Sequence, residues 1–194
     1  MYLKTIDETE AAGKVAEIYA GQKKQLGFVM AAMRCLTVRE DFLPIYNAFI
    51  DGLRGGFTLA QRDWRLITLI AARHVPSTYC SFVFGKQLIT DLGSKDMVLV
   101  VHRDFRSAGL PLRDVAMLTY AEKVASDASQ VTQADIDTLR AAGFSDANIC
   151  DIALCAAFRC FIGRYFDAVG AGPEASFLDE DPVWRASMTV GKAI

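Results

Sequence analysis

Apolar residues recur at the three- and four-residue spacing of an α-helix through almost the whole chain, and no segment shows the sustained alternation of a β-strand. Only five prolines interrupt this pattern. Together with glycines that can end helices, the spacing predicts helices over roughly residues 10–25, 40–53, 58–75, 77–92, 95–106, 112–126, 133–142 and 145–169. The sequence therefore predicts an all-α protein.

Local signals set several of these boundaries. Thr58-Leu59-Ala60-Gln61 has the pattern of a capping box, with Thr58 as the N-cap of its helix. Thr132 is expected to cap the helix over 133–142. Pro76 is expected to break the chain between two long helices, because proline cannot continue the backbone hydrogen bonding of a helix interior.

The length of 194 residues suits one helical domain, which we place at 1–172. The tail over 173–194 carries Phe177, Trp184 and Met188, so we expect it to be an arm that packs on a neighbouring subunit. A hydrophobic fraction of 52% is high for a soluble monomer and predicts subunit contacts, because large apolar patches rarely stay uncovered. We therefore expect a homo-oligomer.

Charge and segment composition exclude several classes. A net charge of −2 gives no electrostatic basis for binding nucleic acid. No apolar run approaches the roughly 20 residues of a membrane span, and we do not expect the first residues to be a signal peptide. Five cysteines, an odd number at low density, favour a reducing compartment, so a cytoplasmic location is expected.

Several passages of the chain follow one known family in order and spacing. They are 13–19, 26–29, 118–123, 131–132, 139–146, and 161–170 with Arg164 and Asp167. Through these the chain resembles the peroxidase-related branch of the carboxymuconolactone decarboxylase and alkylhydroperoxidase D superfamily, over nearly its whole length up to Phe177. The resemblance implies an alkylhydroperoxidase D-like helical bundle that forms oligomers, with a pocket between helices near its centre.

Peroxidase members of that family carry a glutamate-bearing helix followed by a Cys-x-x-Cys-x-x-x-His segment, whose second cysteine attacks peroxide as a thiolate. Here the resemblance puts Cys80 at the attacking position, next to a family-like Tyr79. The other positions have changed, and they hold Ser77 for the resolving cysteine, Phe84 for the histidine and Arg65 for the glutamate. The resemblance therefore implies that the dithiol peroxidase chemistry is lost.

Two helical faces in this region suggest a lined pocket. One is a polar stripe of Gln61, Arg65 and Thr68. The next helix presents, on one face, Ser77, Cys80, Phe84 and Gln87. If the two faces meet, as the family implies, Arg65 and Cys80 border one cavity, and Arg65, Thr68, Ser77 and Phe84 contact a substrate. Alternatively, the first stripe faces solvent.

The histidines give no clear catalytic arrangement. His74 lies nine residues after Arg65, which a regular helix places on the opposite face. It is either a structural histidine or an acid–base group that reaches the pocket through the break at Pro76, in which case it joins Cys80 and Tyr79 as a catalytic candidate. His102 is expected on an exposed surface without a role.

The last long helix carries further polar residues. Cys150, Cys155 and Cys160 recur every five residues and share no face, so they are expected to fill the core rather than bind a metal. For Arg159 and Arg164 we expect structural ion pairs. No metal or organic cofactor is indicated, because zinc spacing, phosphate loops and dinucleotide fingerprints are lacking in the sequence.

Three functions fit these observations. The first is metal-free lyase, decarboxylase or isomerase chemistry on a small, carboxylate-bearing molecule held by Arg65, since a guanidinium matches a carboxylate. The second is a one-cysteine hydroperoxide reductase that uses Cys80. The third is a non-catalytic oligomer that binds a small molecule. Whether the protein is an enzyme stays open at this point.

Overall fold

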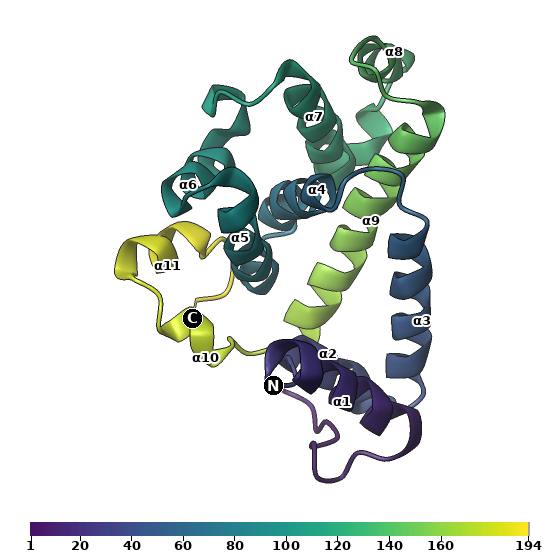
Figure 1. Ribbon diagram of the computed structural model, residues 1–194, viewed down its shortest axis with the longest axis vertical. Helices are drawn as coiled ribbons and strands as arrows, with labels where there is room; N and C mark the ends of the chain where they lie inside the picture. The colour runs from purple at the N-terminus through teal and green to yellow at the C-terminus, as the bar shows by residue number, and fades with distance from the viewer. Residues whose placement is uncertain (194) are drawn as a thin grey trace. The chain divides into compact units, whose positions relative to one another are not determined.

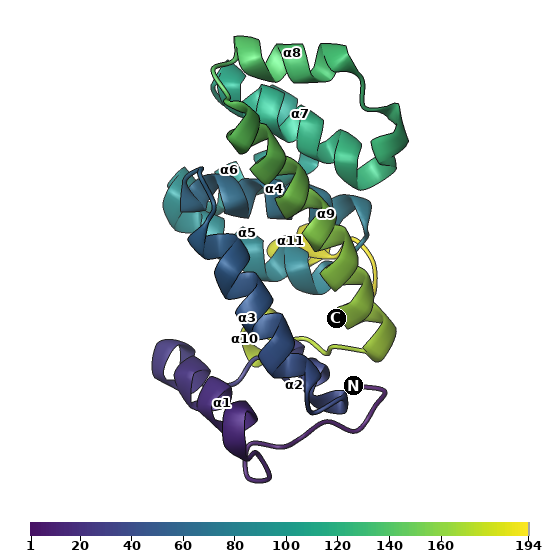
Figure 2. The ribbon, with the colours of Figure 1, turned by 90° about the vertical axis from the view of Figure 1, so that its right-hand side faces the viewer.

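The computed structural model describes residues 1–193 and is built of α-helices and short 3-10 helices, with no β-strand among these residues (Figure 1 and Figure 2). The prediction of an all-α protein is therefore confirmed. The chain forms two compact units. The first combines Met1–Gly56 with Tyr165–Leu178, and the second combines 57–164 with the tail from Asp179.

The first unit holds the N-terminal helices α1 (Gly13–Leu26), α2 (Ala31–Cys35) and α3 (Phe42–Gly55), the last turn of α9 (Asp146–Val169) and α10 (Ala175–Leu178). Polar contacts link its segments. The Tyr165 hydroxyl donates to the Cys35 carbonyl at 3.0 Å, and the buried Glu174 carboxylate accepts from the Ala31 N–H at 2.7 Å. These bonds connect the two chain segments that make up the unit.

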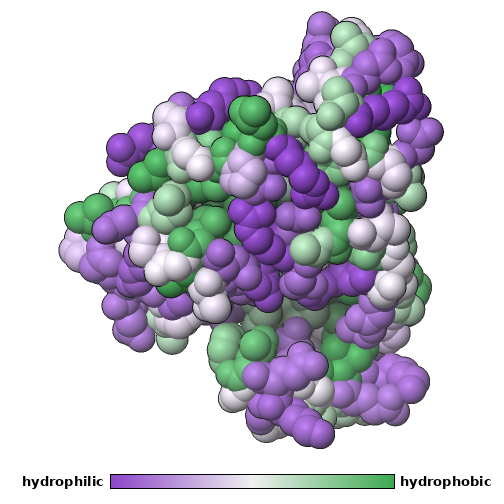
Figure 3. Space-filling view, turned by 45° about the horizontal axis from the view of Figure 1, so that its top comes forward, coloured by the Kyte–Doolittle hydropathy of each residue, from purple (hydrophilic) through white to green (hydrophobic). Residues whose placement is uncertain are grey.

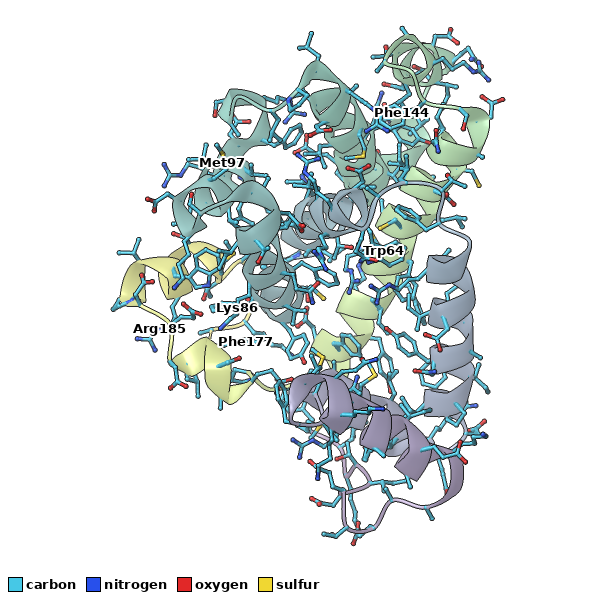
Figure 4. All side chains as sticks on the ribbon, viewed as in Figure 1. Trp64, Lys86, Met97, Phe144, Phe177 and Arg185 are labelled. Carbon is cyan, nitrogen blue, oxygen red and sulfur yellow. The ribbon has the colours of Figure 1, made fainter. Side chains whose placement is uncertain are left out.

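The second unit holds α4 (Gln61–His74), α5 (Thr78–Leu92), α6 (Lys95–Asp104), α7 (Leu112–Asp127), α8 (Gln133–Ala141), most of α9, and α11 (Pro182–Met188). Helix α4 is at its centre, since nine of its 14 residues are buried and it packs against both α5 and α7 (Figure 1). Trp64 of α4, labelled in Figure 4, packs on Phe158 of α9 with ring centroids 6.3 Å apart. The unit therefore has a core of its own.

The helix boundaries confirm most of the local signals. Helix α4 ends at His74 and α5 begins at Thr78, on either side of Pro76. Thr132 caps α8 in a reciprocal capping box with Asp135. The capping box predicted at Thr58 was wrong, because the Thr58 N–H and hydroxyl both bond to the Asp151 carboxylate of α9, at 2.7 and 2.6 Å. Helix α4 instead starts at Gln61, two residues later than predicted, with Ala60 at the N-cap.

The tail from Asp179 packs within its own unit. Trp184 and Met188 are buried, and both lie against Gly85 of α5. Lys86 of α5, labelled in Figure 4, donates to Glu180 at 2.6 Å. The apolar side chains that prompted the prediction of an arm on a neighbouring subunit are therefore covered by their own chain.

Some apolar side chains do remain exposed, among them Leu154 and Phe161 of α9. On the face drawn in Figure 3, hydrophobic residues lie between hydrophilic ones. Within residues 1–193, no helix has the length and apolar character needed to cross a membrane.

Candidate active site

Cys80 lies in the first turn of α5, as its third residue, after Ser77 at the N-cap. Its side chain is buried, with 1% exposed. The first turn of a helix has unpaired backbone N–H groups and the positive end of the helix dipole, which favour negative charge. No acidic residue occupies this turn of α5. The start of α5 is therefore a favourable position for a negatively charged group.

A buried arginine from α9 contacts this sulfur. The Arg159 Nη1 group donates to Cys80 Sγ at 3.4 Å, although only 5% of Arg159 is exposed. The guanidinium carbon lies 4.5 Å from the centre of the Phe84 ring, which lies one turn after Cys80. Helices α5 and α9 thus bring together Cys80, Phe84 and Arg159.

No carboxylate within residues 1–193 forms a salt bridge with Arg159, and its Nε has no hydrogen-bond partner there. An uncompensated buried ion costs several kcal/mol, even after the protein relaxes around it. A thiolate at Cys80, or a bound anion, would compensate this charge.

Two serine hydroxyls lie on the same face of α5. Ser77 and Ser81 are fully buried, and neither Oγ has a hydrogen-bond partner within residues 1–193. Ser77 lies nearly one turn before Cys80 on this helix, and Ser81 is the next residue after it in the chain. Ser77 faces α9, because a Cβ built on Gly163 would lie 3.3 Å from the Ser77 Cβ, and Gly163 is one turn after Arg159. The face of α5 that meets α9 therefore carries unused hydrogen-bonding groups.

The other cysteines have different surroundings. Burial raises the pKa of the Cys35 thiol to about 11, and burial also raises the pKa of Cys160. Both are therefore protonated at neutral pH. Cys155 is buried, as predicted, and donates to the Trp64 carbonyl at 3.7 Å. Cys150 is exposed, so the prediction that it fills the core was wrong. No group of metal-binding side chains occurs within residues 1–193.

The three residues of the predicted polar stripe on α4 have different surroundings. Arg65 forms a salt bridge with Asp91 at 2.8 Å, which neutralises the charge assigned to a substrate carboxylate. Thr68 is fully buried, and its hydroxyl lies 3.7 Å from Cys155 Sγ. Gln61 is exposed. Asp91 and Cys155 come from other helices, so helical spacing on α4 alone did not reveal these partners.

The two histidines take structural positions. His74 Nε2 lies 3.0 Å from a Glu122 carboxylate oxygen, and Arg106 binds the same carboxylate. Burial alone would raise the pKa of Glu122, but hydrogen bonds from Arg106 and His74 lower it overall. His102 is buried, contrary to the prediction, and its burial lowers the pKa of the imidazole to about 4. The face of α6 that carries His102 is therefore buried, although the sequence predicted that it would be exposed.

Of the sequence-predicted site residues, the structure brings together Cys80 and Phe84 through Arg159, with Ser77 on the same helix face. Tyr79 is buried beside Cys80 in the chain. The structural ion pair expected for Arg159 is absent from residues 1–193, and Ser81 was not singled out. Arg159 could have been found, since it follows the helical spacing of a buried α9 face that includes Ile152, Cys155, Ala156 and Ile162.

Comparison with known proteins identifies the fold. Neither a protein-family model nor a curated protein sequence matches the chain. Among solved structures, the chain is similar to an uncharacterized peroxidase-related protein from Ralstonia eutropha JMP134, described as an alkylhydroperoxidase AhpD core. The TM-score is 0.83 at 23% sequence identity, and the match covers 90% of this chain and 93% of that one. An uncharacterized peroxidase-related protein from Silicibacter sp. TM1040 is also similar, with a TM-score of 0.80 and 21% sequence identity. This match covers 93% of this chain and 98% of that one.

A third similar structure is the debrominase Bmp8, as a cysteine-to-alanine variant in complex with 2,3,4-tribromopyrrole. Its TM-score is 0.77 at 15% identity, and the match covers 97% of this chain and 96% of that one. These identities establish the fold. The chain has the all-helical alkylhydroperoxidase D fold, as the sequence resemblance implied.

Proposed function

We propose that this chain is a one-cysteine hydroperoxide reductase in which Cys80 is the nucleophile. The observation that carries the proposal is the contact between Cys80 Sγ and the buried, carboxylate-free guanidinium of Arg159. A thiol reacts with peroxide as its thiolate, and a neighbouring cation stabilises that form. The similarity in fold to peroxidase-related proteins supports the same reading.

The reaction takes three steps. The Cys80 thiolate attacks the terminal oxygen of a hydroperoxide, the O–O bond breaks, and the departing alkoxide takes up a proton to leave as an alcohol. Cys80 is thereby oxidised by two electrons to a sulfenic acid. One low-molecular-weight thiol then displaces water to form a mixed disulfide, and a second such thiol releases Cys80 and leaves as the oxidised disulfide.

External thiols are needed because Ser77 stands where the dithiol members of the family have a resolving cysteine. All five cysteines are free. Free cysteines fit a reducing compartment in which low-molecular-weight thiols are abundant. A cytoplasmic location is therefore part of the proposal. Assembly into a homo-oligomer is supported by exposed apolar side chains such as Phe161, which is 55% exposed.

Carboxylate-directed lyase chemistry at Arg65 has less support. Asp91 already binds the Arg65 guanidinium, so a substrate carboxylate would have to displace a protein carboxylate. The acid–base group proposed for it, His74, is bound to Glu122. No hydrogen bond within residues 1–193 links His74 to Cys80 or Arg65, so neither His74 nor Tyr79 has an assigned role in the proposed reaction.

Steady-state reduction of cumene hydroperoxide, with dithiothreitol as the reductant, tests the proposal. The full-length protein should consume the peroxide, and Cys80→Ser should remove this activity. The matched control is Cys150→Ser, because Cys150 is exposed and lies nine residues before Arg159 on α9. Equal activity in the wild type and in Cys80→Ser would overturn the proposal.

A further inference from the structure

We propose that Ser77, Ser81 and the free edge of the Arg159 guanidinium form a binding subsite for a small carboxylate next to Cys80. The inference rests on the proposed function in taking Cys80 as the reacting residue, and it assigns that reaction a substrate class. The substrate carries a carboxylate close to the group that reacts with the sulfur.

The Arg159 guanidinium has N–H donors that no protein group within residues 1–193 uses. Of its five N–H groups, the structure uses one on Nη1 for Cys80. The planar face lies against the rings of Phe84 and Phe158, at 4.5 and 5.6 Å, and these contacts leave the edge free. Nε is buried and has no partner within residues 1–193. An arginine edge of this kind binds the two oxygens of a carboxylate side by side.

Ser77 supplies the second group. A serine at an N-cap normally accepts a hydrogen bond from the second or third N–H of its helix, but the Ser77 side chain makes no such cap. Its Oγ is buried and unpartnered, and the side chain faces Gly163, one turn after Arg159 on α9. The hydroxyl is therefore available, on the side of α5 where Arg159 lies.

Ser81 supplies the third group, one turn further along the same face of α5. It is also fully buried and has no partner for its Oγ. Buried polar groups are nearly always hydrogen-bonded, so three unpartnered ones on Ser77, Ser81 and Arg159 are unusual. A carboxylate is acceptor-only and can take all three donors, and the N-terminal end of α5 adds a further positive pole.

Thermal unfolding with sodium propionate, compared with sodium chloride at the same ionic strength, tests the subsite without any reaction at Cys80. Propionate at about ten times its dissociation constant should raise the Tm of the wild type by roughly 3 °C. The double variant Ser77→Ala/Ser81→Ala should show no rise. It is expected to fold, because each substitution removes a buried hydroxyl that has no protein partner.

Alkylation gives a second measurement. The rate with iodoacetate, which carries a carboxylate, is divided by the rate with neutral iodoacetamide, separately for Cys80 and for the exposed Cys150. The ratio should be about tenfold higher at Cys80 than at Cys150, which corresponds to about 1.4 kcal/mol. It should fall to the Cys150 value in the double variant, and a ratio that stays tenfold higher there would overturn the subsite.

The outcomes separate the two proposals. A serine-dependent rise in Tm in a protein whose Cys80 does not react with peroxide would keep the subsite and remove the peroxidase. Peroxide reduction through Cys80, with no propionate effect or with the same effect in the double variant, would keep the peroxidase and overturn the subsite.

Discussion

Arg159 reaches Cys80 across the contact between α9 and α5, with its Nη1 3.4 Å from the sulfur and no carboxylate of residues 1–193 beside it. Other buried charges of the second unit are paired. Asp63 and Asp114, for example, both interact with Arg62 and Arg113. A buried cation without a carboxylate lowers the stability of a fold, and such groups concentrate at functional sites. Stability and reactivity should therefore respond in opposite directions when Arg159 is replaced.

Arg159→Met should slow the alkylation of Cys80 by iodoacetamide at pH 7 by tenfold or more, because the cation that favours the thiolate is removed. The free energy of unfolding should stay unchanged or rise by up to about 4 kcal/mol, since an unpaired buried charge is replaced by an apolar chain of similar length. Mass spectrometry of the Cys80 peptide and urea unfolding measure the two effects.

The matched control is Arg62→Met on α4. Arg62 is paired with Asp114 at 2.7 Å, so its removal leaves buried carboxylates with weaker partners and should lower stability by about 3 kcal/mol. A stability loss of that size in Arg159→Met as well would show that Arg159 is a structural residue.

Gly163→Ala tests the close approach of α9 to α5. The added Cβ would lie 3.2 Å from Val75 Cγ2 and 3.3 Å from Ser77 Cβ, so these neighbours have to shift by a few tenths of an ångström. We expect a stability loss of about 1 to 3 kcal/mol, as is typical of overpacking, together with slower alkylation of Cys80. Gly52→Ala in α3 is the control, because nothing lies within 4 Å of its Cβ and alanine favours a helix. Equal effects of the two changes would contradict the close approach.

The fold was predictable from the sequence because its signals are local. Apolar spacing, the glycine after α5 and the break at Pro76 set helix boundaries that depend on short stretches of chain. The capping box at Thr58 failed for the opposite reason, since Asp151 lies 93 residues away in the sequence. Local capping patterns cannot anticipate a partner from another helix.

The site was predictable only in part. The family resemblance located Cys80, Ser77 and Phe84, which lie on one helix and so share a face by spacing alone. The charge that acts on Cys80 comes from Arg159, 79 residues away, whereas Arg65, the cation expected there, is bound to Asp91. Two arginines on buried helices look alike in sequence, and only the positions of carboxylates on other helices distinguish them.

Glu180 anchors the C-terminal tail through Lys86 and Lys95, each at 2.6 Å. Burial alone would raise the pKa of Glu180, but the hydrogen bonds from these lysines lower it overall. Glu180→Gln should therefore loosen the tail, and amide hydrogen exchange in α11 should become several times faster at pH 7. Asp179→Asn, a change at the exposed neighbouring position, is the control. Unchanged exchange in Glu180→Gln would show that Trp184 and Met188 alone hold the tail.

His102 should make stability depend on pH. Its imidazole has a pKa of about 4 in the folded protein and about 6.5 when unfolded, because burial disfavours the charged form. The unfolded chain thus binds the extra proton between these values, so stability is complete above pH 6.5 and decreases as the pH falls towards 4, by up to about 3 kcal/mol. Urea unfolding at several pH values should show a shallower decrease for His102→Gln, and parallel curves would contradict this account.

The most direct test of the central claim is to treat the wild-type protein with one equivalent of cumene hydroperoxide. Peptide mass spectrometry then measures which cysteine is oxidised and how fast. We predict that a single oxygen adds to Cys80 well before the exposed Cys150 reacts, and that Arg159→Met abolishes this preference. Oxidation that begins at Cys150, or that reaches Cys80 equally fast without the Arg159 charge, would contradict the assignment of Cys80 as the nucleophile.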